Sequence, residues 1–185
     1  MKSRVFAFAA LLLLLAGTAS ARQAPPADAY RQLTKVTPLP VALDPAFEFR
    51  KTKLFVLGDN RRANLGGNLG RGNAKAPAIA AENSYYMYGA VTALDVRRRS
   101  GNYFDFFWRV KRPADVTVRL EYQQENLRAF TQAREVSYEN VKGSRKTSFR
   151  IVGDDYFGDG RVLAWRCLLI ERGRIVAEDR SFLWR

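Results

Sequence analysis

The sequence predicts an all-β protein, built as an antiparallel β-sandwich of about seven strands. Three observations support this fold class. Apolar and polar residues alternate along several segments after Ser84, and turn-forming residues separate those segments. The chain carries no heptad pattern, long amphipathic helix or internal repeat. A period of two is typical of strands with one buried face, so the alternating segments are expected to pair around a shared core.

Residues 1–21 have the pattern of a secretory signal peptide. Lys2 and Arg4 form a short positive segment, an apolar run follows, and an Ala-Ser-Ala site ends at residue 21. The apolar run is too short to span a bilayer comfortably. We therefore expect an exported bacterial protein, periplasmic or extracellular, with no stable membrane span after cleavage.

Two further segments are expected before the sandwich. Residues 22–50 carry five of the seven prolines, which predicts an extended linker. Residues 51–83 combine a short strand at 53–57 with a stretch rich in glycine, asparagine and arginine at 60–76. That stretch is expected to be a mobile loop. The sandwich domain is accordingly placed at residues 84–185.

The first strands of this domain are expected at residues 87–96, 104–110 and 116–122. The even-numbered residues of the second and third segments are apolar and predict one buried face. Residues 112–115, with the sequence Arg-Pro-Ala-Asp, are expected to be the turn of a hairpin between these two strands.

The remaining strands are expected at residues 134–141, 147–151, 163–169 and 175–184. Cys167 alternates in phase with the apolar residues of its segment, so we expect it to behave as a small hydrophobic residue in the core. Gly173 lies between the last two segments, where a hairpin turn requires positive φ.

The stretch GDDYFGDGRVLAWRC, residues 153–167, gives a more specific resemblance. An acidic, glycine-containing corner leads into a strand in which Trp165 stands two residues before Cys167. This arrangement resembles the E-to-F corner of immunoglobulin and fibronectin type III sandwiches, where a tyrosine holds that place. The resemblance covers residues 84–185 and implies architecture alone, because such folds host unrelated functions.

The composition removes most catalytic chemistry. The chain contains no histidine, which excludes Ser-His-Asp and Cys-His catalysis and histidine-bound zinc. The glycines of residues 67–72 follow neither the phosphate-loop nor the dinucleotide-binding spacing, so no nucleotide is expected. We therefore predict a protein that is not an enzyme and uses no cofactor.

Two clusters leave alternatives open. Asp154, Asp155 and Asp159 could ligate calcium, but their spacing favours a turn in which aspartates accept hydrogen bonds from backbone amides. The tyrosines of residues 85–88 could stack on sugars, although half-buried packing is commoner at the start of a strand. Phe107 lies on the face opposite its apolar neighbours, so that face is either covered or exposes an aromatic ring for binding.

The charge balance indicates anionic partners. The full sequence has a formal charge of +13, and removal of the signal peptide leaves 29 basic and 18 acidic residues, or +11. Anionic glycans, lipopolysaccharide and phospholipid surfaces are the expected partner classes. Export makes nucleic acid the least expected of the anionic partners.

In an immunoglobulin order, three connections fall at one end of the sandwich: residues 111–115, 142–146 and 171–174. They hold seven basic and two acidic residues. The predicted contacts are Lys111, Arg112, Arg145, Lys146, Arg172 and Arg174, joined by Arg61 and Arg62 from the glycine-rich stretch. The competing interpretation is that these are solvated turn residues that keep a basic protein soluble.

These observations predict an exported binding or structural module that engages an anionic envelope polymer or a protein partner through a basic end. Two alternatives stay open. The alternating strands and the terminal aromatic of residues 181–185 are compatible with a small outer-membrane β-barrel. The tyrosines and scattered carboxylates are compatible with a carbohydrate-binding or carbohydrate-active protein.

Overall fold

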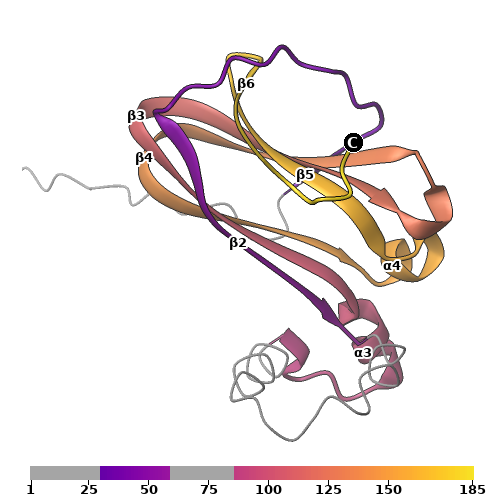
Figure 1. Ribbon diagram of the computed structural model, residues 1–185. Coiled ribbons are helices and arrows are strands. Elements are labelled where there is room, and N and C mark those ends of the chain that lie inside the picture. Colours follow the sequence, from indigo (N-terminus) through magenta and orange to yellow (C-terminus); the bar gives the residue numbers. More distant parts are fainter. Residues whose placement is uncertain (1–29, 59–85) are drawn as a thin grey trace, which may run out of the picture.

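The computed structural model describes residues 30–58 and 86–185. These residues form a mostly antiparallel β structure with short helices, which confirms the all-β class (Figure 1). The predicted signal peptide, the tyrosine at position 85 and the glycine-rich stretch with Arg61 and Arg62 lie outside the described residues.

A single six-stranded sheet forms the body of the described chain. The elements, in chain order, are β1 (Arg31–Leu33), β2 (Phe47–Leu57), α3 (Ala93–Arg99), β3 (Gly101–Gln124), a 3-10 turn η1 (Glu125–Leu127), β4 (Thr131–Val152), α4 (Asp154–Asp159), β5 (Val162–Glu171) and β6 (Arg174–Arg180).

Strand β3 lies at the centre of this sheet. It pairs with β4 along nearly its whole length, from Gly101 opposite Val152 to Gln123 opposite Thr131. On its other side, the first half of β3 pairs with β2 and the second half pairs with β5. The short strand β1 pairs with β4, and β6 pairs with β5.

The length of β3 and β4 corrects two predictions. The expected strands 104–110 and 116–122 are one continuous strand, and so are the expected strands 134–141 and 147–151. Residues 111–113 make no ladder pair with β4, so Pro113 can lie within the strand without removing a needed N–H donor. The predicted hairpin at 112–115 is therefore a bend within a strand. In residues 86–185, four strands form where about seven were expected, and β1 and β2 complete the six-stranded sheet of the described chain.

The bend is made by irregularities on both long strands. The register of the β3–β4 ladder shifts on either side of Ala114. Opposite this point, Asn140 has a φ of 47° and Gly143 a φ of 87°, both in the left-handed region. Bulges of this kind bend a strand and increase its twist. After the bulge, the inward-facing residues of β4 change from even-numbered to odd-numbered positions.

The bend folds the sheet into two arms that face each other. The first arm contains β2 with residues 101–110 and 143–152, and the second contains β5 and β6 with residues 114–124 and 131–141. Trp165 of the second arm meets Phe104 and Phe106 of the first, with ring centroids 6.1 and 5.5 Å apart. The core therefore lies between the arms. We call the side where β3 and β4 bend the bend end. The opposite side, where the two arms end and where η1 and α4 lie, is the open end (Figure 1).

Helices α3 and α4 replace expected β or turn structure. Residues 93–96 belong to α3, so the strand predicted at 87–96 was wrong. Thr92 and Asp95 form a reciprocal capping box at its first turn, which favours the helix. The acidic corner, expected to be a turn, forms the single-turn helix α4 between β4 and β5.

The C-terminal hairpin confirms a prediction. Cys167 is fully buried beside Trp165 and Leu169 in the core, and burial raises the pKa of its thiol well above the usual range. Arg172 and Gly173, with φ values of 48° and 74°, form the two-residue turn between β5 and β6. Positive φ at both positions is the geometry that suits tightly paired strands. Strand β6 ends at Arg180, four residues before the expected end.

The sheet also includes chain that precedes residue 84. Besides β1 and β2, residues 40–44 run along β6: the Ala42 amide donates to the Ile175 carbonyl at 2.8 Å, and the Ile175 amide donates to the Pro40 carbonyl at 2.9 Å. Leu39 packs on a small apolar cluster that contains Ile175. This segment supports the outer side of the second arm close to the bend end.

Candidate functional site

Three segments distant in sequence meet at the bend end. The bend of β3, the bulge of β4 and the β5–β6 turn together line a polar cavity of about 210 Å³. Its lining residues are Arg112, Pro113, Ala114, Asp115, Asn140, Glu171 and Arg172. The structure therefore brings residues 111–115 and 171–172 together, although a strand bend rather than a hairpin loop places the first of these segments.

Arg112 is held by carboxylates of its own chain. Its guanidinium donates two hydrogen bonds of 2.6 Å to Glu171 and one of 3.0 Å to Asp44. It also lies 4.8 Å from the centre of the Phe47 ring. These contacts join the bend of β3 to β5 and to the chain before β2. Arg112, a predicted ligand contact, is thus occupied in positioning the segments of the bend end.

The electrostatics of this cluster follow from its hydrogen bonds. The Arg112 guanidinium lowers the pKa of the Glu171 carboxyl from its ordinary value. The backbone amide of Ala46, and after it Arg112, lowers the pKa of Asp44. Both carboxylates therefore stay ionised under mildly acidic conditions, which keeps the cluster assembled.

The other arginines of the bend end are exposed. Arg145, Arg172 and Arg174 are open to solvent, and within residues 30–58 and 86–185 no carboxylate forms an ion pair with them. Lys142 has the same character, whereas the Lys111 ammonium donates to the Pro45 carbonyl at 2.7 Å. We call these exposed cations the rim: Arg172 lines the cavity, and Lys142, Arg145 and Arg174 lie two to five residues along the chain from its lining residues. The Arg112 cluster inside the cavity is already neutralised.

The remaining predicted contact points away from the cavity. Lys146 lies on the outer face of the first arm, where its ammonium contacts the Asp105 carboxylate at 2.8 Å. The same ammonium is 5.6 Å from the centre of the Phe107 ring. Phe107 is partly exposed. The outcome therefore lies between the two predicted alternatives, a covered face and an exposed aromatic ring.

The Asp115 side chain binds the backbone of β4 at the cavity. Its carboxylate accepts a hydrogen bond of 2.7 Å from the backbone N–H of Asn140. Asn140 occupies the left-handed region that asparagine tolerates better than most residues. The contact therefore fastens the bulge of β4 to the bend of β3.

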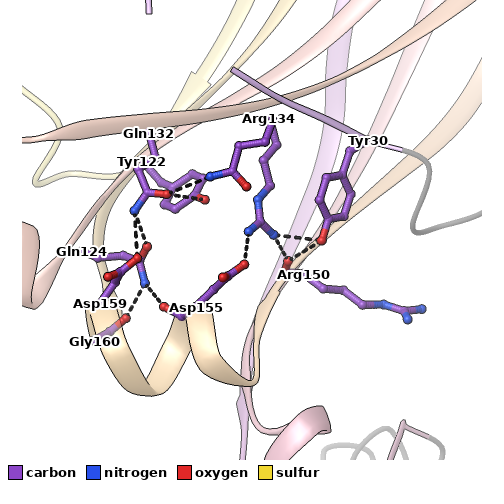
Figure 2. A network of polar contacts seen from close by, with 10 residues as sticks. Tyr30, Tyr122, Gln124, Gln132, Arg134, Arg150, Asp155, Asp159 and Gly160 are labelled. Atoms are coloured by element: carbon purple, nitrogen blue, oxygen red, sulfur yellow. Dashed lines mark hydrogen bonds and ion pairs between the residues drawn. The ribbon is translucent and has the colours of Figure 1, made fainter. Parts of the chain in front are cut away.

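The open end contains a buried polar network that the sequence interpretation missed. Figure 2 shows Arg134 of β4 reaching Asp155 of α4, the Tyr30 hydroxyl and the Arg150 carbonyl. Arg134 is only 1% exposed and lies 4.6 Å from the centre of the Tyr30 ring. The sequence contained a signal for this burial, because Arg134 alternates in phase with Val136, which lies on the inward face of the same strand.

Two glutamines extend this network to the end of α4 (Figure 2). The Gln124 amide donates to the Asp155 and Gly160 carbonyls at 2.8 and 2.6 Å, and it accepts from Gln132 at 2.8 Å. Tyr122 donates to Gln132 at 3.2 Å, and burial raises the pKa of Tyr122 to about 12. The network fastens α4 to β3 and β4 at the open end.

The three aspartates near α4 contact side chains rather than the backbone amides expected. Asp154 pairs with Arg97 at 3.2 Å, Asp155 pairs with Arg134, and Asp159 accepts from Gln132 at 3.4 Å. In the described part of the chain, no group of three potential ligands is placed to hold a metal ion.

The tyrosines around position 86 do not share one role. Tyr86 packs on Phe55 and Tyr103, with ring centroids 5.2 and 4.9 Å apart. Tyr88 is 84% exposed. The described tyrosines thus form no common stacking platform.

The outer face of the second arm is also charged, but its charges are paired. Glu135 contacts Arg31 and Arg119, each at 3.2 Å, and Glu121 contacts Arg166 at 2.8 Å. Glu121 and Arg119 are largely buried. Such a ladder presents little net charge to a partner.

Comparisons with known proteins identify no family. No family model and no curated protein matches the chain. A solved crystal structure from Akkermansia muciniphila is a distant structural neighbour, with 14% sequence identity and a TM-score of 0.42 over 85% of this chain and 74% of that chain. Among the described residues, no helix is long and apolar enough to cross a membrane.

Proposed function

We propose that this protein is an exported, non-enzymatic binding module that holds an anionic envelope polymer at its bend end. One observation carries the proposal. Arg145, Arg172 and Arg174 are exposed with no ion-pair partner among the described residues, whereas many other arginines, on the second arm and at the open end, are matched by carboxylates.

The local structure suits such a role. Guanidinium groups form paired hydrogen bonds with phosphate, sulfate and carboxylate groups. Arg172 is carried by a tight turn, and Arg174 begins a paired strand, so their backbones are preorganised. Arg112 and its two carboxylates hold the neighbouring segments together. Affinity then comes from exposed arginines whose backbone positions are fixed. Because these arginines lie on the surface, they favour a repeating polyanion over a small ligand that is enclosed in a cavity.

The absence of histidine from the sequence supports binding rather than acid–base catalysis. Cys167 is buried in the core, so its thiol is withdrawn from reaction with a ligand. An immunoglobulin-like sandwich remains our proposal for the broader architectural class of this chain, and it adds nothing to the functional assignment.

The proposal is tested by a charge-matched pair of triple variants. One removes the rim, with Arg145→Gln, Arg172→Asn and Arg174→Gln; asparagine preserves the left-handed conformation at position 172. The control, Arg98→Gln, Arg128→Asn and Arg185→Gln, removes three exposed arginines elsewhere. Arg128 also has positive φ, 53°, which matches the Arg172 change.

The probe is inorganic polyphosphate, with binding measured by calorimetry at several salt concentrations. Wild-type affinity should fall steeply as the Debye length shrinks from about 10 Å at 0.1 M salt to about 3 Å at 1 M. The rim variant should flatten the slope of log K against log salt by up to about three, one for each lost contact. Equal losses in both triple variants would overturn the proposal, since they would show only a response to net charge.

A further inference from the structure

A second feature lies on the outer face of the first arm, next to the bend end. Lys51 of β2, Phe107 of β3 and Lys146 of β4 are direct neighbours across three strands. Phe106 and Trp108, on either side of Phe107, are fully buried in the core. Because successive strand residues point to opposite faces, the three neighbours share the outer face.

Polar contacts fix the position of one cation in this row. Asp105, which is 6% exposed, accepts from the Ser148 hydroxyl at 2.6 Å and contacts the Lys146 ammonium at 2.8 Å. The ammonium is thereby held over the partly exposed Phe107 ring, 5.6 Å from its centre. Lys51, on the other side of the ring, is exposed.

The row opens toward the bend end. Arg109 and Lys111 follow Phe107 at alternate positions on the same face, and both are exposed. Four residues along a strand span about 13 Å. In the opposite direction, the face is covered by the packed rings of Phe55, Tyr86 and Tyr103. An extended ligand would therefore run from the Phe107 row to the rim.

We propose that this row is a ring-stacking subsite and that the anionic polymer is an acidic polysaccharide. This inference rests on the proposed function. The apolar face of a sugar ring can pack on the part of Phe107 that the Lys146 ammonium leaves open, while the exposed Lys51 and Arg109 meet the carboxylates of the sugar chain. A polyanion without rings finds the same charges but cannot stack. The combination of an aromatic ring and flanking cations thus distinguishes uronic-acid chains from polyphosphate.

The test compares two probes of equal charge on the wild type and three variants, with the charge-matched triple variant as a control. The probes are an oligogalacturonate and inorganic polyphosphate. Phe107→Leu removes the ring and preserves apolar volume, Phe107→Tyr preserves the ring, and the rim triple variant reports on the bend end. Phe107→Leu should weaken oligogalacturonate binding about fivefold, equivalent to roughly 1 kcal/mol, and polyphosphate binding by less than about twofold. Phe107→Tyr should bind both probes like the wild type, and circular dichroism checks that all variants are folded.

The outcomes separate the two proposals. If the wild type binds both probes with salt dependence and Phe107→Leu changes both equally, or neither, the ring subsite is overturned while the anion-binding function stands. If the rim triple variant and its charge-matched control behave alike, or no salt-dependent binding occurs, the proposed function fails and the subsite fails with it.

Discussion

Individual arginines at the two ends of the folded sheet have opposite environments. At the open end, Arg134 is 1% exposed and contacts Asp155, Tyr30 and a backbone carbonyl. At the bend end, Arg145 and Arg172 are exposed and have no ion-pair partner among the described residues. The same residue type is therefore a buried structural partner at Arg134 and an exposed cation at Arg145 and Arg172. Net charge therefore indicates an anionic partner only when arginines that pair with carboxylates of the same chain are left out of the count.

The largest expected effect is on stability at the open end. Asp155→Ala would leave the Arg134 guanidinium buried without its carboxylate. Uncompensated buried charges are costly, so we expect the free energy of unfolding to fall by about 3 kcal/mol. Urea denaturation measures this loss. Polyphosphate affinity should be unchanged under conditions where the variant is folded, and a weakened affinity would contradict the division of roles between the ends.

Replacing the arginine itself should cost less than removing its partner. Arg134→Met fills a similar volume without charge, and Asp155, half exposed, can return to water. We expect a loss of about 1 kcal/mol, because apolar groups often replace buried ion pairs at small cost. The double variant should then be more stable than Asp155→Ala alone. A double variant that is less stable would show that the pair is not the main contribution of these residues.

A matched pair of single changes compares the ends directly. Arg172→Asn and Arg128→Asn both replace an exposed arginine whose φ is near 50°. The first should weaken polyphosphate binding about fivefold, the scale of one surface cation near a polyanion, and the second less than about twofold. Both should leave the free energy of unfolding within about 0.5 kcal/mol of wild type. Calorimetric titration and urea denaturation provide these values.

The smallest effect concerns acid stability at the bend end. The pKa of Glu171 is lowered in the folded state by Arg112, from an ordinary value of 4.5. The resulting stabilisation is present above that value and is lost as the pH falls through the lower folded value. Arg112→Gln should flatten the decline in stability below about pH 4.5. In this variant the pKa of Asp44 should stay partly lowered, because its largest cause is the hydrogen bond from the Ala46 backbone amide. An unchanged pH profile of unfolding would contradict the role given to Arg112.

Local patterns predicted the faces of the strands better than their ends. The alternation around Phe106, Val118 and Cys167 correctly identified buried faces, because that signal depends only on neighbouring residues. Pro113 suggested a turn, but the ladder skips residues 111–113 and the strand continues through them. The bulge at Asn140 depends on a contact with Asp115 from another strand, which no local pattern shows.

The basic site was predicted in part. Residues 112–115 and 171–172 line one cavity, although the prediction placed them together as loops of an immunoglobulin order and residues 112–115 are a bend within β3. The internal partners of Arg112 and Lys146 were not foreseen, since Glu171, Asp44 and Asp105 approach them through tertiary packing. The capping box at Thr92 and the inward phase of Arg134 were local signals that could have been used.

Hydrogen–deuterium exchange with and without inorganic polyphosphate tests the central claim most directly, because it compares both ends of one unmodified protein. We predict slower exchange in residues 111–115, 142–146 and 171–174 at low salt, and its reversal at high salt. Residues 154–160, in and after α4, should exchange at the same rate in both samples. Protection confined to α4, or spread evenly over the molecule, would contradict the assignment of anion binding to the bend end.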